Sequence, residues 1–188
     1  MNWRDGEKES NGKDSSALSN ERKDPISLLE AEHRLFLEIC ATLESVADGL
    51  PDSADIALAQ NAAENLAKYQ TGHYKDESEI LFPAVRERVG KEHSLTRTLN
   101  LLEFQRAQDI DLLSEIREVL QTGIIGSRPE NPNMFGYMLR SYFTSERRQI
   151  SWERQIILPA ARTLLTEKDL ALLAKRLSHR DHISLTRN

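Results

Sequence analysis

A histidine and a glutamate stand four residues apart in the stretch from residue 73 to residue 83, within a pattern of helical periodicity. One helix face would carry the His73 imidazole and the Glu77 carboxylate about one turn apart, both pointing the same way. Leu-Phe-Pro follows one turn later, and Pro83 should stop or kink the helix. Imidazole and carboxylate suit iron, zinc and manganese. The spacing therefore indicates half of a metal site, whose other half must come from facing helices.

Four long amphipathic segments can supply those facing helices. The first begins at Asp24-Pro25, an N-cap followed by proline at the first helical position. The others are expected from about residue 53 to 83, from 94 to 120 and from 134 to 158. Short connections favour an all-α, antiparallel up-down four-helix bundle, with a short fifth helix beginning at Thr166.

Polar residues interrupt the apolar stripe of each segment near its middle. His33 stands in the stripe of the first helix. The third helix places Gln105 and Asp109 inward beside Leu112, and the fourth places Gln149 and Glu153 inward. Glu146 is assigned to a solvated face beside two arginines.

The second and fourth helices repeat one pattern. Positions 73, 77 and 83 correspond at a constant offset to Gln149, Glu153 and Pro159. His33 and Gln105 form a looser match between the first and third helices. The two halves therefore read as copies of one helical hairpin, in which the second copy has glutamine where the first has histidine.

These motifs resemble the hemerythrin family, whose bacterial form is often called the HHE cation-binding domain, over about residues 24–165. The resemblance implies a four-helix bundle that holds two iron atoms. In that pattern, a histidine lies on helix 1 and His-x3-Glu before Leu-Phe-Pro on helix 2. One or two histidines lie on helix 3, and a histidine and then a carboxylate on helix 4. The family's ligand positions fall here on His33, His73, Glu77, Gln105, Asp109, Gln149 and Glu153.

The departures from the family pattern change the expected metal content. In the family, the histidines of helices 1 and 2 serve one iron, those of helices 3 and 4 serve the other, and the carboxylates bridge. A glutamine carbonyl is a weak ligand beside imidazole. One divalent ion also balances Glu77 and Glu153, whereas two leave a buried positive charge. We expect a mononuclear or asymmetric non-haem iron site with one or at most two ions. Another divalent metal and a metal-free core, with the glutamine amides bonded to the glutamates, stay open.

The resemblance implies oxygen, nitric oxide or peroxide as the ligand, and hence sensing or carrying of a gas or redox signal. An enzyme that turns over peroxide or repairs iron clusters is a second hypothesis. It is less favoured because no acid–base pair separate from the ligands is visible. A degenerate metal-free bundle that acts as an interaction or regulatory module is the third. A homodimer or a regulatory protein partner fits any of these.

Composition excludes several other classes. The net charge is −5 with no dense basic cluster, which argues against nucleic-acid binding. No apolar run reaches membrane-spanning length, and a single cysteine, Cys40, suits a reducing cytoplasm. Residues 1–23 mix both charges with few apolar side chains, so a disordered tail is expected there. The predicted organisation is this tail, the bundle at 24–165, and a helix and tail at 166–188.

Overall fold

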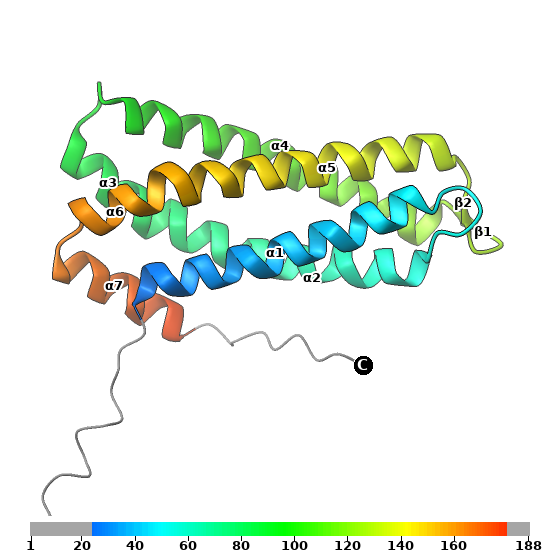
Figure 1. The fold of residues 1–188 in the computed structure, drawn as a ribbon, viewed down its shortest axis with the longest axis horizontal. Helices are drawn as coiled ribbons and strands as arrows, with labels where there is room; N and C mark the ends of the chain where they lie inside the picture. The colour runs from blue at the N-terminus through cyan, green and yellow to red at the C-terminus, as the bar shows by residue number, and fades with distance from the viewer. Residues whose placement is uncertain (1–23, 180–188) are drawn as a thin grey trace, which may run out of the picture.

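The computed structural model describes residues 24–179. The tail predicted at residues 1–23 and the last residues, 180–188, lie outside this range. The long helices are α1 (Pro25–Asp48), α2 (Ile56–Asp76), α4 (Ser94–Thr122) and α5 (Pro132–Trp152). They form the expected all-α bundle, which is confirmed (Figure 1). A short hairpin of β1 (Ile124–Ile125) and β2 (Arg128–Pro129) connects α4 to α5.

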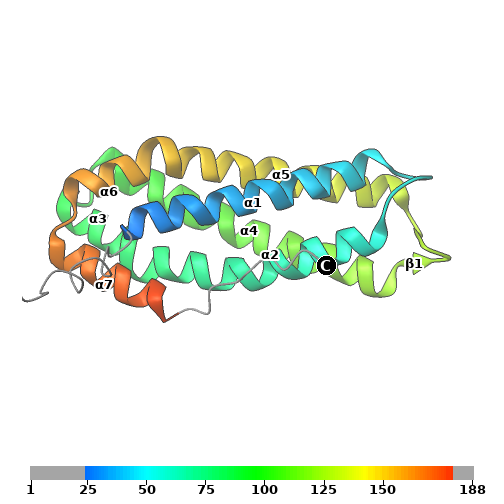
Figure 2. The ribbon, with the colours of Figure 1, turned by 60° about the horizontal axis from the view of Figure 1, so that its bottom comes forward.

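Each long helix packs between two antiparallel neighbours. α1 and α4 each contact both α2 and α5, and Figure 2 shows the four rods side by side. The predicted fifth helix is α7 (Glu167–Ser178), which packs across α1 and α2 at the end where α1 begins. Within residues 24–179, no helix is long and apolar enough to cross a membrane.

The helix starts follow from local capping. The Asp24 side chain accepts hydrogen bonds from the backbone N–H groups of Ile26 and Ser27, and Pro25 takes the first helical position. Thr166 and Asp169 form a capping box at the start of α7. The two starts predicted from these residues are confirmed.

Two π-helical turns carry the chain past Pro83, which was expected to stop or kink the helix, and past Pro159, its counterpart in the repeat. η1 (Glu77–Leu81) leads into α3 (Phe82–Val89), and η2 (Glu153–Ile157) leads into α6 (Leu158–Leu164). Proline lacks an N–H and its ring collides with the preceding turn of an α-helix. A single widened turn relieves such local strain and often marks a functional site. Both π turns begin at a glutamate, in corresponding positions of the two halves.

The core consists of two apolar clusters separated by a polar layer. One cluster lies towards the hairpin end and includes Phe36, Leu43 and Tyr142. The other lies towards α7 and includes Leu29, Phe82 and other buried side chains. Histidines, carboxylates and an arginine on the inward faces of the long helices make up the layer between them.

Replacing Leu43 by alanine should lower the free energy of unfolding by about 3 kcal/mol, because a fully buried leucine leaves a cavity when truncated. Leu58→Ala is the matched control, since 42% of Leu58 is exposed, and should cost less than about 1 kcal/mol. Urea unfolding of both variants measures the difference. Equal losses would mean that Leu43 is not in a tightly packed core.

Candidate metal centre

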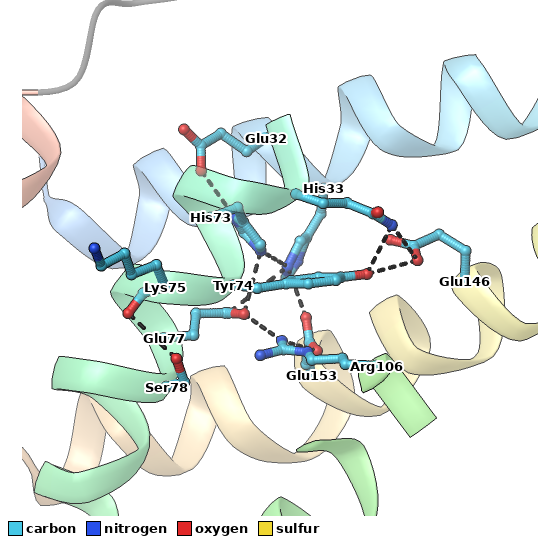
Figure 3. Close-up of polar contacts among 11 residues, drawn as sticks. Glu32, His33, His73, Tyr74, Lys75, Glu77, Ser78, Arg106, Glu146 and Glu153 are labelled. Carbon is cyan, nitrogen blue, oxygen red and sulfur yellow. Dashed lines mark hydrogen bonds and ion pairs between the residues drawn. The ribbon is translucent and has the colours of Figure 1, made fainter. Parts of the chain in front are cut away.

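Four buried side chains from four different elements converge in the polar layer. His33 comes from α1, His73 from α2, Glu77 from the start of η1 and Glu153 from the start of η2. Each offers one nitrogen or oxygen atom, and these four atoms all lie within 4.8 Å of one another. Figure 3 shows the two imidazoles facing each other, with both carboxylates on the same side of them.

The separations within this group match those between ligands of one metal ion. His33 Nε2 lies 3.1 Å from His73 Nε2 and 2.9 Å from Glu153 Oε2, and His73 Nε2 lies 3.3 Å from Glu77 Oε2. Metal–ligand bonds of about 2.1 Å place neighbouring ligand atoms roughly 3.0–3.4 Å apart. Three pairs of donor atoms are therefore spaced like the ligands of a single ion, while His33 Nε2 and Glu77 Oε1 are 4.0 Å apart.

The orientation of the His73 ring is fixed by Glu32, which contacts the ring nitrogen that does not face the group. Its Nδ1 lies 2.7 Å from Glu32 Oε2, so Nδ1–H donates to the carboxylate when the ring is neutral, and Nε2 keeps its lone pair towards the group. Carboxylates in this position orient metal-binding histidines and increase their basicity. Burial lowers the pKa of His73, but Glu77 and Glu32 outweigh it and leave the pKa above its usual value. A metal ion would compete with a proton at this ring.

An arginine joins the two carboxylates on the side opposite the histidines. The Nη2 group of Arg106, on α4, donates to both Glu77 and Glu153. The guanidinium carbon lies 4.4 Å from the centroid of the Tyr74 ring and 4.7 Å from that of Phe82. Burial lowers the pKa of Arg106, but the carboxylates outweigh it, so the side chain stays charged. Sequence reasoning missed this residue.

The charge of Arg106 affects the pKa of Glu153. Burial raises the pKa of this carboxyl group, but Arg106 and the contact with His33 lower it by more, so its pKa lies below the usual value. Glu77 Oε1 is buried and has no hydrogen-bond partner among the described residues. This oxygen lies 4.0 Å from His33 Nε2 and, having no hydrogen bond, could accept a cation.

The remaining predicted ligands lie elsewhere in the layer. Gln149 and Asp109 are both buried, and the Gln149 amide donates to the Asp109 carboxylate. Gln105 is only half-buried, and its Oε1 has no hydrogen-bond partner among the described residues. The structure thus brings together His33, His73, Glu77 and Glu153, pairs Gln149 with Asp109, and leaves Gln105 at the edge.

A second buried polar cluster adjoins the first. Glu146 was assigned to a solvated face, but it is 1% exposed and accepts hydrogen bonds from Tyr74 (2.7 Å) and Gln70 (3.2 Å). Gln70 also donates to the Tyr142 hydroxyl. The spacing of Tyr142, Glu146, Gln149 and Glu153 alternates four and three residues, which is the signal that places Glu146 inward.

The family of the chain follows from comparison with known proteins. Residues 24–161 match the Hemerythrin HHE cation binding domain, and the chain belongs to this family. No curated protein matches the sequence. A helical domain of a metal-binding family, with a buried histidine–glutamate group at its centre, is therefore established.

The residues present fit a metal ion on the histidine side. On the histidine side, two imidazoles and the unpartnered Glu77 Oε1 are donors of the kind that iron, zinc and manganese accept. On the other side, the guanidinium of Arg106 already neutralises one oxygen of each carboxylate.

Glu146→Gln should change how stability depends on pH in chelator-treated protein. Burial, aided by Glu153 and Asp109, raises the pKa of Glu146 from 4.5 to about 7. The folded state therefore binds a proton more tightly than the unfolded state, so stability falls as pH rises from about 4.5 to 7. The loss amounts to roughly 3 kcal/mol, and the variant should lack it.

Urea unfolding at pH 5 and pH 8 measures this difference. Glu44→Gln is the control, because Glu44 is exposed, pairs with Arg147 and has a lowered pKa. Its effect should be the same at both pH values. If the Glu146 variant kept the pH dependence of the wild type, Glu146 would not be the titrating group.

Proposed function

We propose that this protein binds one non-haem iron ion through His33, His73, Glu77 and Glu153, and uses it to bind a small gas or oxidant as a signal. The convergence of these four donor atoms within 4.8 Å carries the proposal. Membership of the cation-binding family supports it, and so does the carboxylate behind His73. The lone buried Cys40 thiol suits a reducing cytoplasm.

The protein's own residues prepare the site in three ways. Glu32 holds the His73 ring with its lone pair inward. The two π turns present Glu77 and Glu153 from opposite halves of the bundle. The apolar clusters on either side of the layer limit access of water and of large molecules.

Iron held by two histidines and two carboxylates supplies coordination positions for a ligand the size of oxygen, nitric oxide or peroxide. Such a ligand needs little space, which agrees with a layer bordered by the buried rings of Phe36, next to His73, and Phe82, next to Arg106. Among the described residues, we assign no acid–base pair other than the four donors to a reaction. We therefore favour sensing or carrying over turnover.

A metal-free interaction module is the second candidate, and one observation favours it. Arg106 already offsets the charge of Glu77 and Glu153, and a proton between His33 and Glu153, 2.9 Å apart, would complete the network. In this case the layer specifies the packing of the bundle. Metal content distinguishes the two candidates.

Protein purified from iron-supplied cells should contain about one iron per chain, and His73→Ala should reduce this to less than about a tenth, because it removes both a ligand and its link to Glu32. Gln149→Ala is the matched control on the facing helix and should keep the wild-type content, since its amide binds Asp109. Elemental analysis of folded protein measures both. Equal losses would show that Gln149 is a ligand.

Reduced, iron-loaded protein should give a new electron paramagnetic resonance signal when nitric oxide is added anaerobically. The signal should be absent in His73→Ala and retained in Gln149→Ala. Iron-loaded protein that gave no signal would contradict ligand sensing, and a wild type without any metal would favour the interaction module.

A further inference from the structure

We infer that Arg106 is a built-in cation that takes the place of a second metal ion, limits the centre to one ion and favours the divalent state of that ion. The inference deepens the proposed function and rests on it for the identity of the ion. It starts from the symmetry of the chain: the constant offset between the two halves predicts equivalent positions on the two sides of the carboxylate pair.

One side of the pair faces His33 and His73 from the first hairpin, at ligand distances. The other side would face the corresponding second-hairpin residues, Gln105 and Gln149. There the guanidinium of Arg106, the neighbour of Gln105 on α4, contacts Glu153 Oε1 and the same Glu77 Oε2 that lies near His73. A positive group that touches both carboxylates stands where a bridged second cation would stand.

The guanidinium is held by one nitrogen, Nη2, that contacts both carboxylates, and by two aromatic rings. Arg106 is 4% exposed, and its guanidinium lies close to the rings of Tyr74 and Phe82. Arginine is not deprotonated in proteins, and planar stacking of this kind fixes its orientation. Unlike a metal ion, this charge is present in every state of the protein.

The charge of Arg106 also bears on the ion at the histidines. The carboxylates of Glu77 and Glu153 carry two negative charges, of which Arg106 cancels one. Among these three side chains and the ion, a divalent ion then leaves one net positive charge and a trivalent ion leaves two. Uncompensated buried charge is costly, so Arg106 disfavours the trivalent state and raises the reduction potential.

Further oxygen-bearing side chains are buried in the same polar layer as Arg106. Glu146 interacts electrostatically with Glu153, Asp109 and Arg106, and Gln149 is bonded to Asp109. Hard divalent ions accept carboxylate and amide oxygens as ligands. If the guanidinium were removed, these groups would be available to a second ion.

The test compares Arg106→Met, which removes the charge, with Arg106→Lys, which keeps it. Arg147→Met is the control, because Arg147 pairs with Glu44 at the surface. Each protein is titrated anaerobically with ferrous iron and then with manganese, and its metal content and reduction potential are measured. In Arg106→Met, the first ion should bind at least about tenfold more tightly, a second should bind, and the potential should fall. Arg106→Lys and Arg147→Met should resemble the wild type in metal content, affinity and potential.

The outcomes separate this inference from the proposed function. If the wild type binds no metal but Arg106→Met does, the proposed function fails, and of the inference only the claim that Arg106 takes the place of a metal ion stands. If Arg106→Met matches the wild type in stoichiometry, affinity and potential, or if neither binds metal, the inference is overturned. If Arg106→Met does not fold, Arg106→Gln, which is neutral but polar, is measured instead and judged by the same criteria.

Discussion

Two buried carboxylates that face each other in the middle of an apolar bundle impose the main constraint on this molecule. Glu77 and Glu153 are each almost fully buried, and each would be costly to ionise alone. The protein meets this cost with positive or proton-bearing groups on both sides, namely Arg106 on one and the histidines on the other. The charges of the polar layer therefore depend on one another, so that removing one changes the balance for the others.

The two π turns of the backbone help to position this layer. Each π turn begins at one of the two glutamates and passes into a proline-containing turn, so the widened turn and the carboxylate occur together in both halves. The apolar clusters on either side keep the layer dry, which strengthens the interactions within it. Glu32 lies at the edge of the layer, 27% exposed, and links it to solvent through His73.

Periodicity and the repeat were sufficient to predict the four-helix bundle, its capped helix starts and a short fifth helix. They also predicted the inward positions of His33, His73, Glu77 and Glu153, because each stands in an unambiguous apolar stripe. The π turns were not predictable, since proline in a helical pattern is as consistent with a stop or a kink as with a widened turn. Pairing between Gln149 and Asp109 depends on the relative rotation of two helices, which a single sequence does not specify.

Gln105 and Leu112, which were placed on the inward stripe of α4, are only half-buried. Gln105 was placed there partly because it matches His33 in the repeat. The stripe with strict alternation of four and three residues runs instead through Leu102, Arg106, Asp109 and Leu113, and these are the buried positions. A charged residue in an otherwise regular stripe implies a buried partner of opposite charge. Because two carboxylates were already expected at the same level, the arginine could have been assigned to them, and with it the cation opposite the histidines.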